Sequence, residues 1–482
     1  MKKTAITILS LLLCVVFAFS VSAESSYIYD VWGKSVASPH AYECAKVLTG
    51  EAMGTTALSA PADIFVDNKN EHIYIADSGN NRIVVVDKNM QLIRIIDKVT
   101  GTTIDTLSAP QGVFVKNGIV YICDTGNNRV IAVDSSNNVT RLIERPKSDL
   151  LSDYLDFKPT KVIVNNSEQV YVLATGIYQG LVLYNEVDEF QRFFAPNTVE
   201  VDLLVQFNQL WKSIFTDAQK EGLTRNLPNE HTNVFFSPDG FIYTATATVE
   251  NKQIRRINAA GNDTLNDNNV TNYDKSGYGD IESVTVNDTK SQSKISDVNV
   301  DSQGIIAALD SEHGRVFLYT QESDLLGVFG NNGKVKGTFS KASAIEKLGD
   351  DYLILDTEKA TVAIYSQTDY FTIVREALTS YKAGEYDASA ELLEKVLDEN
   401  TNFAMGYRLL GRISIMQGDY ETALELLKQG NDKYYYSLAL KENRRQFFNE
   451  NIAVILVSTV LIIGAAYGVS FIIRRRKGAG KK

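Results

Sequence analysis

Cysteine is scarce in this chain, and so is histidine. Of 482 residues, three are cysteine and four are histidine. The histidines (His40, His72, His231 and His313) stand in no pattern with metal-ligand spacing. The chain also lacks a GxSxG elbow, a phosphate-binding loop and an HExxH pair. We therefore predict no catalytic residue, no metal ligand and no cofactor.

The cysteines and prolines set further limits. Outside the N-terminal apolar run only Cys44 and Cys123 remain, and the sequence leaves open whether they form a disulfide or two buried thiols. There are only 8 prolines and no low-complexity tract, so we expect little disorder.

Basic charge is also in short supply. The formal net charge is −11, and basic residues concentrated at both ends leave the stretch between them more acidic still. Such a surface repels nucleic acid and other polyanions. This balance excludes nucleic-acid binding and leaves neutral glycans, peptides and protein partners.

Long apolar runs occur only near the two ends. Residues 1–23 combine two lysines, an apolar stretch and a Val-Ser-Ala ending, which is typical of a cleaved signal peptide. Residues 450–473 predict a transmembrane helix, because their charge-free stretch at 452–473 can span a hydrocarbon core of about 30 Å. The basic tail at 474–482 predicts a cytoplasmic C-terminus. We expect a single-pass protein of the cell membrane with its N-terminal part extracellular.

Between these ends the chain repeats itself. Residues 60–87 and 109–134 share an Ala-Pro start, three apolar strands and a Gly-Asn-Asn-Arg turn, with a period of about 47 residues. Four weaker copies follow at residues 159–184, 232–258, 297–319 and 344–365. Short strands at this period predict an all-β six-bladed β-propeller over residues 24–368.

The ring of blades needs closing. The sixth unit shows no fourth strand, and the Val-Trp-Gly ending of residues 27–33 echoes that of the fifth unit. We therefore expect residues 27–33 to supply the closing strand of the last blade. A solenoid that does not close is the alternative.

Residues 197–230 interrupt the repeats. Apolar residues there, among them Trp211, follow helical spacing and predict a helical insertion. Packing against the propeller and a role as a lid over a ligand are both open. A polar stretch at 262–292 is expected to be a long loop.

A different repeat occupies residues 369–449. A motif with Ala377 and Gly384 recurs with Gly411 and Gly418, at a period of about 34 residues. The spacing resembles that of tetratricopeptide repeats and predicts an all-α helical domain. It serves either as a spacer or as a docking surface for a membrane partner. Gly464 and Gly468 in the transmembrane helix form a GxxxG pair that slightly favours helix association.

The Gly-Asn-Asn-Arg turns are the candidate binding elements. Asp, Asn and Gly suit such a turn structurally, and Arg can pair with its carboxylates. The alternative is that these side chains, with Trp211 as a wall, face a ligand. The candidate ligand-binding residues are Asn80, Asn81, Arg82, Asn127, Asn128, Arg129, Trp211 and Arg315.

The motif Tyr-x-x-Asp-(Ser/Thr)-Gly-Asn-Asn-Arg at residues 74–82 and 121–129 resembles the NHL repeat. The resemblance implies a six-bladed propeller, and the family includes both binding modules and a few enzymes that use a metal in the propeller channel. A cluster of carboxylates from several blades cannot be recognised from sequence spacing. The order of propeller, helical repeats and single span also resembles bacterial surface proteins that accompany carbohydrate ABC importers.

These observations favour a membrane-anchored binding or scaffold protein. Its propeller would recognise a glycan, peptide or protein, and its helices would dock a membrane partner such as a transporter permease. A surface hydrolase or lactonase with a channel metal is the alternative, and a purely structural envelope protein is a third reading.

Overall fold

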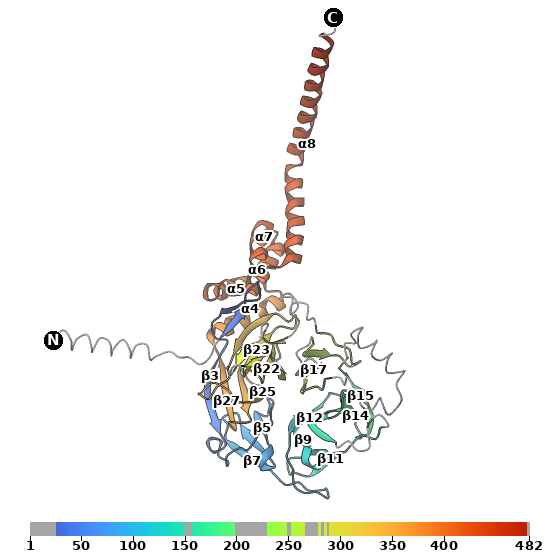
Figure 1. Ribbon diagram of the computed structural model, residues 1–482, viewed down its shortest axis with the longest axis vertical. Coiled ribbons are helices and arrows are strands. Elements are labelled where there is room, and N and C mark those ends of the chain that lie inside the picture. Colours follow the sequence, from blue (N-terminus) through green and yellow to red (C-terminus); the bar gives the residue numbers. More distant parts are fainter. Residues whose placement is uncertain are drawn as a thin grey trace, which may run out of the picture. The chain divides into compact units, whose positions relative to one another are not determined.

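The computed structural model describes residues 26–148, 151, 157–197, 229–247, 252–265, 278–280, 284–286 and 289–479. These residues form a six-bladed β-propeller followed by five helices (Figure 1). The predicted fold class is therefore confirmed. The chain divides into two compact units, Met1–Thr372 and Ile373–Lys482.

Each blade is an antiparallel sheet whose first strand lies innermost. Blade 1 contains β4 (Asp63–Asp67), β5 (His72–Asp77), β6 (Arg82–Asp87) and β7 (Leu92–Ile96). Blade 2 contains β8 (Gly112–Lys116), β9 (Ile119–Asp124), β10 (Arg129–Val133) and β11 (Val139–Ile143). Blade 3 contains β12 (Lys158–Val164), β13 (Val170–Thr175), β14 (Leu181–Tyr184) and β15 (Phe190–Phe194).

The second half of the ring continues the pattern. In blade 4 the described strands are β16 (Asn233–Phe236), β17 (Ile242–Ala245) and β18 (Ile254–Ile257). Blade 5 contains β21 (Ile295–Val300), β22 (Ile306–Asp310), β23 (Arg315–Tyr319) and β24 (Leu325–Phe329). Blade 6 contains β25 (Ala342–Leu348), β26 (Asp351–Asp356), β27 (Thr361–Gln367) and β3 (Tyr42–Thr49).

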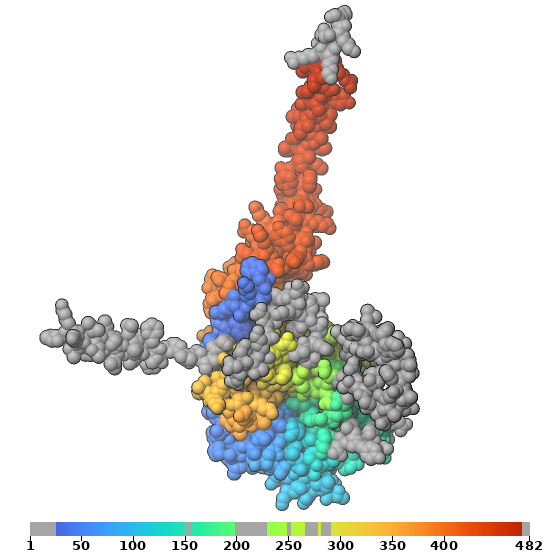
Figure 2. All heavy atoms as spheres, viewed as in Figure 1, coloured from blue at the N-terminus to red at the C-terminus, as the bar shows by residue number. Residues whose placement is uncertain are grey.

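Apolar side chains hold neighbouring blades together. The middle strands are buried on both faces, as their almost continuous Val, Ile, Leu and Tyr content requires. Every innermost strand contacts the innermost strand of the next blade, and β25 contacts β4. The ring is therefore closed, and in Figure 2 the orange surface of the last blade adjoins the blue surface of the first.

The strand that closes the ring is not the one the sequence predicted. Residues 42–49 form β3, which pairs antiparallel with β27, for example Leu48 with Val362. Residues 27–29 instead form β1, which pairs with β2 (Ser35–Ala37) in a small hairpin. The expectation that residues 27–33 close the blade is wrong. Their Val-Trp-Gly ending forms the turn of that hairpin, with Trp32 exposed and Gly33 at a φ of 75°.

The hairpin still belongs to the propeller. Strand β1 packs against β24 of blade 5, and the Ser26 hydroxyl donates a hydrogen bond to the Val328 carbonyl at 3.0 Å. A second short hairpin joins β19 (Val284–Val286) and β20 (Thr289–Ser291) within the stretch expected to be a loop. The predicted helical insertion at 198–228, with Trp211, lies outside the described residues. Cys44 and Cys123 are both free thiols, and Cys123 is buried.

The helical part begins at the end of blade 6. Its helices are α4 (Asp369–Ala383), α5 (Tyr386–Glu399), α6 (Ala404–Gln417), α7 (Tyr420–Gln429) and α8 (Lys433–Ala479). Gly384 and Gly418 follow α4 and α6 with φ of 82° and 81°, the left-handed conformation that ends a helix most cheaply at glycine. A Cβ on Gly411 would come within 2.5 Å of Leu427, so α6 and α7 cross at a position that only glycine fits.

Helix α8 combines two segments that the sequence treated separately. Its apolar part is long and hydrophobic enough to cross a membrane, and none of that window is buried. Because a stretch this apolar is costly to leave in water, α8 is a candidate single membrane span. The end of the helical domain predicted at 369–449, from Lys433 on, belongs to the same continuous helix.

Candidate functional site in the propeller channel

The Gly-Asn-Asn-Arg turns of blades 1 and 2 are built around a buried aspartate. Asp77 Oδ2 accepts hydrogen bonds from Arg82 Nε at 2.7 Å and from Asn80 Nδ2 at 2.9 Å. Asp77 Oδ1 accepts one from the Ser59 amide at 2.7 Å. A carboxylate buried in this way needs such donors, because an unpaired buried charge costs several kcal/mol.

Blade 2 repeats the arrangement. Asp124 Oδ2 accepts from Arg129 Nε and from Asn127 Nδ2, each at 2.8 Å. Asn81 and Asn128 have φ of 55° and 57°, the left-handed region that asparagine tolerates better than most residues.

These contacts place most of the predicted binding residues. Arg82 and Arg129 are only 8% and 4% exposed, whereas Asn80 and Asn128 are exposed. Asn81 accepts a hydrogen bond from the Ala109 amide at 2.7 Å and so ties blade 1 to blade 2. The side chains of Asn80, Arg82, Asn127 and Arg129 hold the turns, and a ligand-binding role for all the predicted residues stays a prediction.

Arg315 of blade 5 departs from this pattern. His313 stands where blades 1 and 2 have Asn80 and Asn127, and its Nδ1 lies 2.7 Å from Asp310 Oδ2. Arg315 turns away from that aspartate, and its Nη1 lies 2.5 Å from Asp280 Oδ2. Tyr27, from the N-terminal hairpin, also donates to Asp280. Blade 5 is not adjacent to blade 1 or 2, so the structure does not bring Arg315 together with the other predicted arginines.

The same turn contains a group with metal-ligand chemistry. Asp280, Asp310 and His313 place one ligand atom each within 4.8 Å of one another. His313 and Asp310 are buried, but the Arg315 guanidinium already supplies positive charge to Asp280. The arrangement therefore works as an ion-pair network without added metal.

The central channel carries the other cluster of charged groups. Successive side chains of a strand point to opposite faces, so alternate residues of the six innermost strands face the channel. The first such layer holds Asp63, Gly112, Lys161, Asn233, Asp297 and Ala344. The next layer holds Phe65, Phe114, Ile163, Phe235, Asn299 and Glu346. The second layer is thus aromatic or aliphatic on blades 1 to 4 and polar on blades 5 and 6, whereas the first layer has polar side chains on blades 1, 3, 4 and 5.

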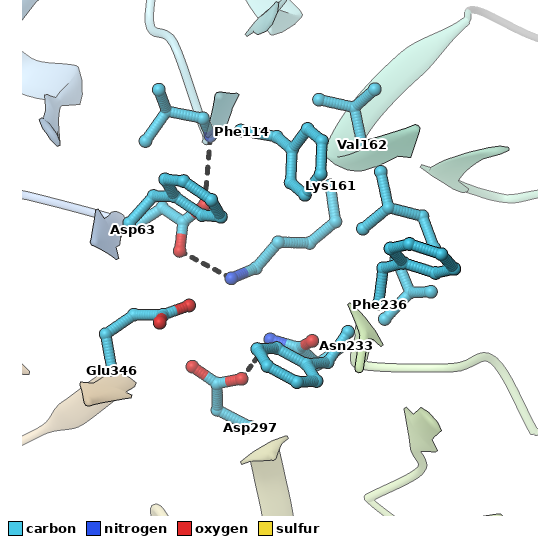
Figure 3. A pocket seen from close by; sticks show the side chains of 13 residues that line it. Asp63, Phe114, Lys161, Val162, Asn233, Phe236, Asp297 and Glu346 are labelled. Atoms are coloured by element: carbon cyan, nitrogen blue, oxygen red, sulfur yellow. Dashed lines mark hydrogen bonds and ion pairs between the residues drawn. The ribbon is translucent and has the colours of Figure 1, made fainter. Parts of the chain in front are cut away.

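A cavity of about 370 Å³, including the space open to solvent at its mouth, lies between these layers. Its walls include three carboxylates, one lysine, one asparagine and several phenylalanine rings (Figure 3). The enclosed part is narrow and has room for water molecules or a small polar group.

Two of the carboxylates join neighbouring blades. Asp63 accepts from its neighbour's amide, that of Ile64, at 2.9 Å and from the Val113 amide of blade 2 at 3.0 Å. Asp297 does the same in blade 5, where it accepts from the Val298 amide at 2.7 Å and the Ile345 amide of blade 6 at 2.8 Å. These bonds give both aspartates a structural role at blade junctions.

Lys161 is the cation of the cluster. Its side chain extends from blade 3 across the channel, and Nζ lies 2.5 Å from Asp63 Oδ1 (Figure 3). Burial opposes the charge of this ammonium, but the attraction of Asp63 and Asp297 outweighs it and raises the pKa of Lys161. Lys161 is therefore a fixed positive charge and not a free amine.

One ammonium does not balance three carboxylates. Burial raises the pKa of Asp297 to about 6, against the opposing effect of Lys161. Burial, with the charges of Asp297 and Asp63, raises the pKa of the Glu346 carboxyl well above its ordinary value. The side chain of Glu346 is half-buried, and it accepts one side-chain hydrogen bond, from Asn299 Nδ2 at 3.0 Å. Glu346 is the carboxylate with the fewest donors.

Sequence reasoning missed this cluster because its members come from different blades. A signal was present, however. Asp63, Lys161 and Asp297 occupy the same position in their repeats, at the start of an otherwise apolar strand. A charged residue at a position that faces other blades costs free energy unless it is paired, so its recurrence indicates a shared polar centre. None of the predicted binding residues in the described part of the chain lines this cavity.

The NHL repeat family model matches residues 58–86, which include β4, β5 and most of β6 of blade 1. Comparison of the sequence with curated proteins gives no significant match. Solved structures with a similar fold include a catalytically inactive variant of virginiamycin B lyase from Staphylococcus aureus with quinupristin. It has 10% identity and a TM-score of 0.40, and the match covers 72% of this chain and 93% of that one.

A second similar structure is the hydrazine synthase of Kuenenia stuttgartiensis. It has 13% identity and a TM-score of 0.39, and the match covers 65% of this chain and 97% of that one. At such identities the likeness concerns the fold alone, because propellers carry many unrelated activities.

Proposed function

We propose that this protein is a membrane-anchored binding or scaffold protein whose propeller recognises a ligand in its channel outside the membrane. The observation that carries the proposal is the half-buried carboxylate of Glu346. It lines the cavity and accepts a side-chain hydrogen bond from one described residue, Asn299. Perturbed ionisable groups in a cavity that combines apolar walls with a few polar groups are typical of binding sites.

Lys161 favours binding over metal-dependent catalysis. A metal held by the channel carboxylates would need several oxygen ligands with no competing cation beside them. The Lys161 ammonium already occupies that position next to Asp63. A surface hydrolase or lactonase with a channel metal is therefore the weaker alternative. Metal analysis of the purified full-length protein tests it, since stoichiometric calcium or zinc would favour the enzyme.

The helical part is proposed to dock a membrane partner, such as the permease of a carbohydrate importer. Supporting this, α8 offers Gly464 and Gly468 on an apolar helix, and a Cβ added at either glycine would meet no atom within 4 Å. Small residues at this spacing allow a second transmembrane helix to approach closely. The proposed topology has the propeller outside the cell, the basic tail inside and residues 1–23 removed.

Co-purification tests this function directly. The tagged full-length protein would be extracted in mild detergent and its bound proteins and small molecules identified by mass spectrometry. We expect a membrane protein to co-purify and to be lost when α8 is replaced by an unrelated transmembrane helix. Recovery of no membrane partner and no ligand of any class would refute the proposal.

A further inference from the structure

We infer that the channel cavity is a subsite for a protonated primary amine, the end of a lysine side chain on a peptide or protein ligand. The inference rests on the proposed binding function and specifies the ligand chemistry of that same site. It follows from three features of the cavity: its unbalanced charge, an unused acceptor and its apolar walls.

The charge of the cavity calls for a second cation. Asp63 is paired with Lys161, and Asp297 is held by backbone amides and by Asn233. Glu346 has neither an ion-pair partner nor a backbone donor from the next blade among the described residues. An added positive charge beside Glu346 would complete the balance that Lys161 begins.

An unused acceptor lies next to that carboxylate. Asn299 is 3% exposed, and its Oδ1 accepts no hydrogen bond from the described residues, although its Nδ2 donates to Glu346. Asn299 stands two residues after Asp297 on β21 and so lies on the same face of that strand, directly behind the Glu346 carboxylate that lines the cavity. A buried acceptor without a donor costs about 1–3 kcal/mol. When Glu346 is ionised, its carboxylate and Asn299 Oδ1 together offer only acceptors to an incoming group, so the group must be a donor.

The walls and the width of the cavity favour an alkylammonium. Phe65, Phe114 and Phe235 also line the cavity, from blades 1, 2 and 4. Such rings accommodate methylene groups and attract a cation near their faces. The enclosed part has room for water molecules or a small polar group such as an ammonium, and not for a sugar ring. A divalent metal would need more oxygen ligands than Glu346 and Asn299 supply, and Lys161 would repel it.

Binding of a matched pair of probes to the full-length protein in detergent tests this subsite. Nα-acetyl-lysine amide carries the ammonium, whereas Nα-acetyl-norleucine amide has the same chain without it. Calorimetric titration above neutral pH is expected to detect the lysine probe only. Equal heats for both probes, or none for either, would overturn the inference and leave ordered water as the occupant. Binding of glucosamine in place of the lysine probe would overturn it too.

Two substitutions separate a ligand-binding Glu346 from a structural one. Glu346→Gln keeps the acceptor for Asn299 but removes the charge, and we expect at least about tenfold weaker binding, as for the loss of a charge-assisted hydrogen bond. Glu358→Gln makes the same change at an exposed site on the same blade and should bind as the wild type does. Unchanged affinity in Glu346→Gln would refute the subsite.

The result can be separated from that of the proposed function. If co-purification finds a ligand or membrane partner that Glu346→Gln still retains, the binding function stands and the lysine subsite falls. If no partner is found but the lysine probe binds, the channel chemistry stands without the scaffold role.

Discussion

The negative charge of Glu346 works against the stability of the fold. Because the pKa of its carboxyl is raised in the folded protein, it stabilises the fold at low pH. That contribution is lost as pH rises through the raised pKa. Asp297, with a pKa of about 6, acts in the same direction.

Glu346→Gln is therefore expected to raise the melting temperature at pH 8 by a few degrees. The difference from the wild type should shrink towards pH 4, where the glutamate is protonated in both folded and unfolded chains. Differential scanning calorimetry over this pH range measures it, with Glu358→Gln as the control. A lower melting temperature at pH 8 would mean that the charge of Glu346 supports the fold.

The buried arginines of the Gly-Asn-Asn-Arg turns, by contrast, should stabilise the fold through their charge. Arg82→Ala leaves Asp77 buried without its ion pair, and we expect a loss of about 3 kcal/mol of stability. Lys88→Ala breaks an exposed pair with Glu71 and should cost less than about 1 kcal/mol. Denaturant unfolding of the full-length protein in detergent compares the two. Weakened ligand binding in Arg82→Ala without lost stability would instead support the predicted binding role.

At the scale of the element, the N-terminal strands are expected to contribute unequally to the stability of the propeller. A mature chain that begins at residue 39 lacks the β1–β2 hairpin and loses the Tyr27 and Tyr29 contacts with Asp280. We expect it to fold with a lower melting temperature. A chain that begins at residue 51 also lacks β3, which leaves β27 as an open edge, and it should fail to give a cooperative transition. Circular dichroism during heating distinguishes the two, and equal behaviour would contradict the role of β3.

Elements carrying the repeat motif could be predicted, and those without it could not. The Asp-(Ser/Thr)-Gly-Asn-Asn-Arg motif favours one local turn conformation. The strands on either side of it, β5, β6, β9 and β10, could therefore be predicted from the sequence. Strand β3 has no repeat signature, and its pairing with β27 is a long-range contact that propensity does not encode. The same limitation hid the channel site, because Glu346 and Asn299 meet only when blades 5 and 6 are assembled.

At the scale of the whole molecule, α8 is the candidate membrane span. Full-length protein should partition into membranes, and a chain ending at residue 449 should appear in the soluble fraction, because the apolar window of α8 is then removed. Fractionation of cells expressing each form measures this. A soluble full-length protein would contradict a membrane span.

The position of β3 also has a consequence for biosynthesis. It is among the first strands of the propeller to be made, but it pairs with one of the last, and the hydrogen bond from Tyr42 to Gln367 joins residues 325 positions apart. Contacts so distant in sequence form slowly, and an unpaired strand edge invites association with other chains. The nascent protein therefore carries an open strand edge until translation passes residue 367. Any chaperone that accompanies it has this strand to shield for most of the time of synthesis.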